Sequence, residues 1–498
     1  MYVSTRANHQ KVTAAQAIAM GMVPEGGLFV PEDIPLLSLD ELKKQMGKSY
    51  EQWANLILAK FLDDYSAEEI EICIHQAYNP QNFDHPDIAP LVKLDQQTYV
   101  MELWHGPTAA FKDMALQLTP YLLTSAIKKL AIEKKVVILV ATSGDTGKAA
   151  LEGFKDVPGT EIIVFYPAHG VSEVQKLQMT TTTGQNTHVV AVEGNFDDCQ
   201  SALKEIFADK ALSQKLEAKG YQFSSANSIN WGRLLPQIVY YFASYSNLVR
   251  DERIVFGETV NFVVPTGNFG NILAGWYAKK MGLPVGKLIC ASNENKVLTD
   301  FFQTGRYDRK REFKQTNSPS MDILISSNLE RFLYAMTGND GIKVAQWMHK
   351  LQHEGEFQID AQTKQAIDEC VYGGFADEEQ TLRAIKTCFS QYGYLLDTHT
   401  AVALKVYQDY QAATGDGKTV IIDSTANPYK FVNSVYQAVS DTQPTDQTDD
   451  LMLLEQLQEL SKMPIHRGLV DLDKKEIRHN ACCARLDIKN QIEAILNL

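Results

Sequence analysis

The stretch NFVVPTGNFGNILAGWYAKKMG, residues 261–282, decides the fold class. Its short apolar run leads through a turn with two glycines into a run with helical spacing. The same order recurs in VVILVATSGDTGKAALEGF (136–154), EIIVFYPAHGVSEVQKLQM (161–179) and HVVAVEGNFDDCQSALKEIF (188–207). Strand, turn and helix in succession are typical of parallel sheets with helices on both faces. We therefore predict an α/β fold that binds its ligands at the carboxyl ends of the strands.

The 498 residues divide into three parts. Residues 1–95 include AAQAIAMGM and YEQWANLILAKFL, whose helical periodicity predicts a mainly helical N-terminal domain. Residues 96–440 hold the strand–turn–helix units and form the α/β region. Residues 441–498 begin in the polar, acidic stretch SDTQPTDQTDD, which predicts a linker, and continue as a tail with an amphipathic helix and a short closing segment.

Bulk composition excludes several classes of partner. A net charge of −14 with no basic stripe argues against nucleic acid. The seven cysteines have no spacing typical of a metal site, and they fit a reducing compartment. No apolar run approaches the roughly 18 residues of a membrane span, and the first residues lack an apolar leader. We expect a cytoplasmic protein without metal, membrane or nucleic-acid partners, either a monomer or a homodimer.

The run LWHGPTAAFKDMALQ, residues 103–117, contains a candidate nucleophile. Lys112 lies between Phe111 and Asp113, behind a Gly-Pro turn. An amine in a partly apolar turn can react because desolvation lowers its pKa and raises its neutral fraction. The alternative is a solvated lysine at a helix start, as most lysines are exposed.

Three further turns offer anion sites, each with a structural alternative. PTGNFGN (265–271) can cradle a phosphate with backbone N–H groups, or it is a plain tight turn.

The second turn, ATSGDTGKAA (141–150), fails the nucleotide P-loop pattern at Thr142 and Ala149. Its Ser143, Asp145 and Thr146 can bind a carboxylate at a helix start, or simply cap that helix. In NSINWGR (227–233), Asn227, Ser228 and Arg233 can bind a phosphate, or cap a helix beside an exposed arginine.

Taken in order, HGPTAAFKD, SGDTG, NSINWGR, PTGNFGN and STANPYKF resemble the threonine synthase family. The segments STR, GGLFVP and DTHTAVAL (397–404) extend the resemblance from about Tyr2 to Phe431. The family implies fold type II, the tryptophan synthase β-like fold. It also implies pyridoxal 5′-phosphate (PLP) as the cofactor, bound between two subdomains of a catalytic region at 96–440.

The resemblance also implies a role for each candidate residue. Lys112 would carry PLP as a Schiff base, and Thr425 would meet the pyridine nitrogen. The cofactor phosphate would be held by Gly267, Asn268, Phe269, Gly270 and Asn271. The substrate, O-phospho-L-homoserine, would be bound at its carboxylate by Ser143, Asp145 and Thr146, and at its phosphate by Asn227, Ser228 and Arg233. Related enzymes often carry Asn where Asp145 stands, so a hydrogen bond to the cofactor O3′ would need a different proton arrangement.

The implied activity is that of a carbon–oxygen lyase acting on phosphates. It converts O-phospho-L-homoserine and water to L-threonine and phosphate, the last step of threonine biosynthesis. Lys112 would move the protons at Cα and Cβ. Two alternatives stay open: a phospho-lyase or amino-acid dehydratase giving 2-oxobutyrate, and a catalytically silent ligand-binding protein on the same scaffold.

Overall fold

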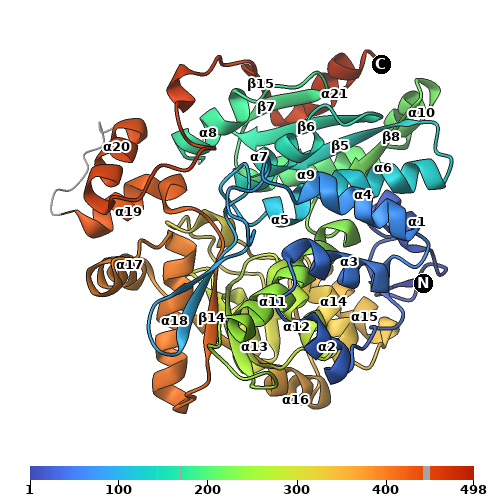
Figure 1. Ribbon diagram of the computed structural model, residues 1–498. Coiled ribbons are helices and arrows are strands. Elements are labelled where there is room, and N and C mark those ends of the chain that lie inside the picture. The colour runs from blue at the N-terminus through green and yellow to red at the C-terminus, as the bar shows by residue number, and fades with distance from the viewer. Residues whose placement is uncertain (143, 169–170, 441–448) are drawn as a thin grey trace.

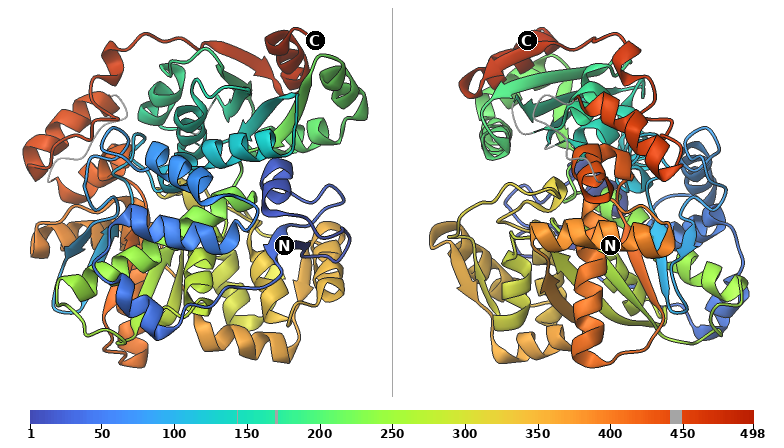
Figure 2. Two further views of the ribbon diagram at one scale, coloured as in Figure 1. Left: turned by 45° about the vertical axis from the view of Figure 1, so that its right-hand side comes forward. Right: turned by 90° about the vertical axis from the view of Figure 1, so that its left-hand side faces the viewer.

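Two separate β-sheets organise the chain in the computed structural model, which describes residues 1–142, 144–168, 171–440 and 449–498 (Figure 1). Ser143 and most of the predicted linker at 441–450 lie outside the described residues. Figure 2 shows the unit built on the smaller sheet above the unit built on the larger one.

The large sheet has six strands in the order β13-β10-β9-β14-β4-β3. Its strands are β3 (Leu91–Lys93), β4 (Thr98–Glu102), β9 (Val260–Pro265), β10 (Val285–Ser292), β13 (Val371–Phe375) and β14 (Val420–Ser424). All neighbours are parallel except β3 and β4. Alternate residues of β9 face opposite cores: Phe262 packs with the helices α11 and α12, and Val263 with α18.

Helices therefore cover both faces of this sheet. They are α11 (Trp231–Arg250), α12 (Gly270–Lys280), α13 (Val297–Thr304), α14 (Leu329–Met336), α15 (Gly341–His353), α16 (Ala361–Cys370), α17 (Glu378–Tyr392), α18 (Thr398–Thr414) and α19 (Val432–Val439). Two short strands, β11 (Arg306–Asp308) and β12 (Glu356–Gln358), form an antiparallel pair among them.

The small sheet is wholly parallel, in the order β15-β7-β6-β5-β8. Its strands are β5 (Lys135–Ala141), β6 (Thr160–Pro167), β7 (Thr187–Glu193), β8 (Tyr221–Ser225) and β15 (Ala481–Ala484). Its helices are α5 (Asp113–Leu116), α6 (Thr119–Lys129), α7 (Asp145–Phe154), α8 (Glu173–Thr180), α9 (Phe196–Ala208), α10 (Lys210–Ala218) and α21 (Ile488–Leu496). The predicted α/β fold with parallel sheets and helices on both faces is confirmed.

The tail differs from its expected helical form. It begins with α20 (Asp450–Ser461), but the later strand β15 pairs with β7, placing Ala481 opposite Val190. Figure 1 shows the tail running from α20 to the edge of the small sheet. The run ACCA is too short for any periodicity to distinguish a strand from a loop, so only the fold reveals it.

The N-terminal part is mainly helical. It contains β1 (Tyr2–Ser4), β2 (Phe29–Pro31), α1 (Ala14–Met20), α2 (Leu39–Gln45), α3 (Tyr50–Phe61) and α4 (Ala67–Ala77). Each helix begins with a capping box, in which a Ser or Thr hydroxyl and a Glu or Gln side chain satisfy the free N–H groups. The part shares a core with the large sheet, since Trp53 stacks on Phe242 of α11 at 5.4 Å. The domain boundaries at 95 and 440 stay a prediction.

Candidate active site

Lys112 lies just before α5, on a segment that runs beside the end of β14. The Phe111 N–H donates to the Thr425 carbonyl at 2.8 Å, and the Asn427 N–H donates to the Ala109 carbonyl at 3.0 Å. An isolated β-bridge joins Ala110 to Ala426 between them. These backbone contacts bring the motifs HGPTAAFKD and STANPYKF together, although some 300 residues separate them in the sequence.

The turn before Lys112 is held by Asp113. Its carboxylate accepts from the Thr108 hydroxyl at 2.7 Å and from the Thr108 N–H at 2.8 Å. Any side chain at Gly106 would overlap that carboxylate, so the turn requires glycine there. Burial raises the pKa of Asp113 to about 6. Asp113 thus fixes the backbone that presents the lysine.

The Lys112 amine is in an environment that favours its neutral form. Its side chain is 12% exposed, and its Nζ lies 3.7 Å from Asp145 Oδ2. Burial lowers the pKa of Lys112; Asp145 opposes this shift, whereas the positive charges of Lys430 and Arg233 add to it. A mostly buried amine with a lowered pKa is suited to attack a carbonyl group.

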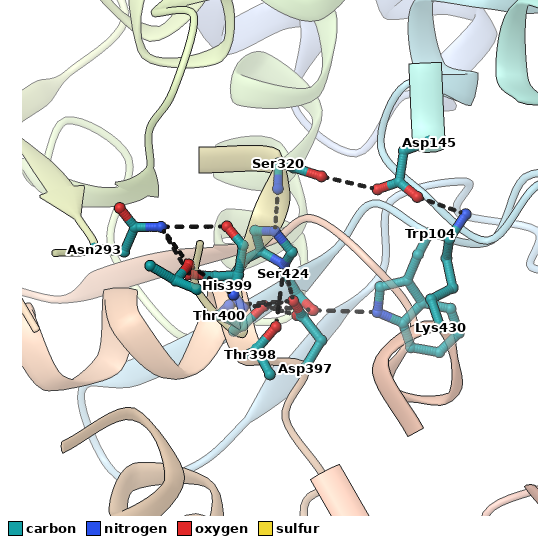
Figure 3. Close-up of polar contacts among 12 residues, drawn as sticks. Trp104, Asp145, Asn293, Ser320, Asp397, Thr398, His399, Thr400, Ser424 and Lys430 are labelled. Carbon is teal, nitrogen blue, oxygen red and sulfur yellow. Dashed lines mark hydrogen bonds and ion pairs between the residues drawn. The ribbon is translucent and has the colours of Figure 1, made fainter. Parts of the chain in front are cut away.

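Asp145 begins α7 and lies among positive and polar groups (Figure 3). Its oxygens contact Lys430 Nζ at 2.8 Å, Gln175 Nε2 at 2.8 Å and Ser320 Oγ at 3.2 Å. Burial alone would raise the pKa of Asp145, but the ammonium groups of Lys430 and Lys112 outweigh it and hold that pKa far below its usual range. The carboxylate is therefore ionised.

Thr142 caps the start of α7. Its hydroxyl accepts from the N–H groups of Gly144 and Gly147, both at 2.9 Å. Thr146 is half-buried on the first turn of the helix. Ser143, predicted to bind the substrate carboxylate, lies outside the described residues.

The turn between β9 and α12 lies at the carboxyl end of β9. The neighbouring parallel strand β14 ends at the same edge of the sheet, beside the Lys112 segment. Phe269 has the left-handed conformation, with φ 64°, and its ring packs against Phe332 at 5.3 Å. A Cβ at Gly267 would lie 2.8 Å from the Ser320 carbonyl oxygen. Only the backbone of Phe269 can therefore contact a ligand, and the N–H groups at the start of α12 offer an anion site.

The Asn271 side chain lies in the core, where its Oδ1 is bound and its Nδ2 has no hydrogen-bond partner among the described residues. Its Oδ1 accepts from the hydroxyls of Tyr240 and Tyr241 on α11, and the Tyr241 hydroxyl also lies 3.1 Å from Asp423 Oδ2. Asn271 can thus contribute its backbone N–H, while its side-chain oxygen belongs to a buried polar network. The sequence motif alone could not separate these two uses.

We expect Asp423→Asn to flatten the pH dependence of stability. Burial raises the pKa of Asp423 to about 8, so the folded carboxyl stays protonated up to that pH. The unfolded carboxyl ionises above about pH 4, so between about pH 4 and 8 each pH unit lowers stability by up to about 1.4 kcal/mol. Thermal midpoints across this window would measure the slope. Glu379→Gln, at an exposed carboxyl, is the control; equal slopes in both variants would contradict the assignment.

Arg233 lies in the first turn of α11 as a buried cation. It is 3% exposed and donates to the Ala226 carbonyl, but its Nε has no partner among the described residues. Burial lowers the pKa of Arg233 to about 10. A buried guanidinium normally has a partner for each of its donors. The free Nε–H of Arg233 could therefore donate a hydrogen bond to a bound anion. The structural alternative of an exposed arginine beside a helix cap is therefore wrong.

Two residues that the sequence analysis missed connect Ser228 to the glycine turn. Asn328 Nδ2 donates to the Ser228 hydroxyl at 3.3 Å and to the Asn268 carbonyl at 3.0 Å. The buried Arg331 holds the Asn328 amide by a bond of 2.6 Å. Asn227 is half-buried at the end of β8, beside Ser228. Ser228 of one motif and Asn268 of the other are therefore bridged by a single side chain.

His399, in the segment DTHTAVAL, is hydrogen-bonded to the backbone of Ser320 (Figure 3). Its Nε2 accepts from the Ser320 N–H at 3.1 Å, and its Nδ1 lies 3.0 Å from Asp397 Oδ1. Only the tautomer with hydrogen on Nδ1 satisfies both contacts. Through Ser320, this ring helps to fix Asp145.

His399→Phe should weaken the site because it leaves the Ser320 N–H without its acceptor and removes one of the donors to Asp397. Losing one buried hydrogen bond costs about 1–3 kcal/mol, which corresponds to roughly 5- to 150-fold. We expect a loss of cofactor affinity or of kcat in this range, with partial recovery in His399→Gln, which retains an acceptor. Unchanged cofactor binding and kcat in His399→Phe would contradict the positioning role.

The residues present fit a cofactor with a phosphate and a carbonyl group. The α12 start offers backbone donors for the phosphate, and Lys112 offers a reactive amine. The Thr425 side chain is buried, and its hydroxyl has no hydrogen-bond partner in the described ranges. Within those ranges, no cluster of His, Cys, Asp and Glu suits a metal ion.

This combination is typical of pyridoxal-phosphate enzymes, and residues 82–425 match the family model for a pyridoxal-phosphate dependent enzyme. Residues 1–78 match the model of the threonine synthase N terminus, and residues 400–479 match that of the threonine synthase C-terminal region. The chain belongs to the threonine synthase family of PLP-dependent enzymes. The predicted family and cofactor are confirmed.

Relatives from several organisms support this assignment. The chain is 40% identical to human threonine synthase-like 1, with 98% of this chain and 67% of that protein covered. It is 38% identical to threonine synthase of Pseudomonas aeruginosa (88% of this chain, 90% of that one) and 35% identical to that of Saccharomyces cerevisiae (98% and 99%). The two kinds of relative carry different names, so membership of the family alone leaves the exact activity open.

Solved structures agree with the fold over nearly the whole length. The PLP-bound threonine synthase from Brucella melitensis is 34% identical, with a TM-score of 0.86 and coverage of 99% of this chain and 98% of that one. The yeast enzyme is 32% identical, with a TM-score of 0.87 and coverage of 99% and 97%. No helix among the described residues combines the length and apolarity that crossing a bilayer requires.

Proposed function

We propose that this chain is a threonine synthase, converting O-phospho-L-homoserine and water to L-threonine and phosphate. The observation that carries the proposal is Arg233, a buried cation without a carboxylate partner among the described residues, close enough to Lys112 to lower its pKa. A second anion position lies at the start of α12. One phosphate comes with the cofactor, and the other belongs to the substrate.

Lys112 would hold the cofactor and later move the substrate protons. When bound, PLP supplies an electron sink that makes the bonds at the substrate Cα easier to break. The amine, once released, would accept the Cα proton, give that proton up within the site, and then accept a Cβ proton. Protons would return at Cγ after the phosphate leaves and at Cα when the product forms. One group can serve two adjacent carbons because it is tethered beside both, so proximity matters more than basicity.

Arg233 and Ser228 would bind the substrate phosphate and retain it as it leaves Cγ. Thr146 and the N–H groups at the start of α7 would receive the substrate carboxylate. Asp145 is ionised and would repel that carboxylate, so we revise its predicted role: it belongs beside Lys112 and the cofactor. Gly267, Asn268, Phe269, Gly270 and Asn271 would hold the cofactor phosphate through their backbone, and Thr425 would meet the pyridine nitrogen.

Product identity tests the proposal. The purified enzyme with added PLP should release threonine and phosphate from O-phospho-L-homoserine in equal amounts. Release of phosphate with 2-oxobutyrate and ammonia would instead make the protein a phospho-lyase. No turnover of this substrate would support the silent binding protein and contradict the proposal.

A further inference from the structure

Lys430 is a second lysine at the candidate site, and the sequence analysis gave it no role. It lies in a single 3-10 turn, Pro428–Phe431, directly after β14, and its side chain is fully buried. Its Nζ contacts Asp145 Oδ1 at 2.8 Å, the Thr108 carbonyl at 2.9 Å and Gln178 Oε1 at 3.1 Å. The ammonium therefore uses all three of its donors.

These three partners come from different parts of the fold. Thr108 belongs to the turn that presents Lys112, Gln178 to α8 of the small-sheet unit, and Asp145 to the start of α7. Lys430 itself follows a strand of the large sheet. Figure 3 shows Lys430 and Ser320 approaching Asp145 from opposite sides. One buried ammonium thus ties both units to the segment that carries the reactive amine.

Two lysines contact the Asp145 carboxylate, and Lys430 lies closer to it than Lys112 does. Lys430 lies 2.8 Å from one carboxylate oxygen, whereas Lys112 lies 3.7 Å from the other. A buried charge is costly unless it is paired, so each lysine gains from the carboxylate. Because Lys430 has the shorter contact, it neutralises most of the charge that would otherwise stabilise a proton on Lys112.

We infer that Lys430 is a positioning residue. It forms the main ion pair of Asp145 and so leaves Lys112 free to act as a neutral amine. The inference rests on the proposed role of Lys112. It also accounts for an acidic residue at position 145, since Asp145 and Lys430 act as a pair: the carboxylate compensates the charge of the buried Lys430, and Lys430 keeps the carboxylate from stabilising a proton on Lys112.

The test is the pH dependence of cofactor capture by the full-length chain after removal of its PLP. PLP is added back, and its visible absorbance band reports the rate of bonding to Lys112, which requires the neutral amine. The charged groups that act on Lys112 are Asp145, Lys430 and Arg233. Without Lys430, Asp145 pairs with Lys112 alone, so the midpoint of the pH profile should rise by about one pH unit or more in Lys430→Met.

Lys148→Met is the matched control. Lys148 is a mostly buried lysine on the same helix as Asp145, but it pairs with Glu152 at 2.9 Å. Its variant should keep the wild-type midpoint. A Lys430→Met midpoint equal to that of the control would overturn the inference. Because no substrate is present, this result is independent of whether the chain makes threonine.

Two further variants cover the case in which Lys430→Met does not fold. Lys430→Gln keeps a donor for the Thr108 carbonyl without the charge, and it should raise the midpoint in the same way. Asp145→Asn removes the group that attracts the proton, so the midpoint should fall below the wild-type value. An unchanged midpoint in either folded variant would also contradict the inference.

Discussion

Replacing Lys112 with alanine should abolish turnover and cofactor retention together. The Lys112 amine lies 3.7 Å from Asp145 Oδ2 and has a lowered pKa, and the proposal gives it both the cofactor bond and the proton transfers. Losing positioned acid–base catalysis alone costs roughly 10²- to 10⁴-fold. We expect a loss at or beyond the upper end, together with loss of the visible absorbance of the bound cofactor.

Lys148→Ala is the control for the general effect of removing a mostly buried lysine. It should keep the cofactor band and most of the activity. If Lys112→Ala retained the band and turned over O-phospho-L-homoserine at a rate near that of the control, the assignment of the reactive lysine would be wrong.

Arg233→Ala should damage turnover of the phosphorylated substrate far more than it damages cofactor loading. Each charge-assisted hydrogen bond to phosphate contributes about 1.5–3 kcal/mol, so kcat/KM should fall roughly 10- to 150-fold or more. The cofactor phosphate lies with the α12 start in this proposal, so PLP affinity should change little. Steady-state kinetics and a PLP titration of the same preparation would measure the two effects.

Arg250→Ala provides the matched comparison, since Arg250 is the last residue of the same helix and its ion pairs are exposed. It should leave both quantities unchanged. Equal losses of PLP affinity and kcat/KM in Arg233→Ala would show that Arg233 serves the cofactor or the fold, and would contradict its role at the substrate phosphate.

The sequence predicted the fold class well because the signal is local. Each strand, glycine turn and helix between 136 and 282 lies within about twenty residues, and periodicity reports such units directly. The short edge strand β15 was missed for the opposite reason: four residues carry no period, and pairing with β7 decides their structure.

The candidate site was predicted only in part, because many of its contacts join distant residues. Lys112, Arg233 and the glycine turn stand out as motifs, yet Lys430 reaches Thr108 across 322 positions and Ser320 reaches Asp145 across 175. Such partners depend on how the two units pack. The motif also could not tell that the side chains of Phe269 and Asn271 turn into the core, since the left-handed φ of Phe269 and the tyrosine pair of α11 set their directions.

The most direct test of the central claim is turnover of O-phospho-L-homoserine in water enriched in ¹⁸O, with mass analysis of both products. The account predicts threonine with one solvent oxygen in its hydroxyl group, formed one for one with phosphate that contains none, because the C–O bond breaks and water adds at Cβ. Solvent oxygen in the phosphate, or phosphate released without threonine, would contradict it.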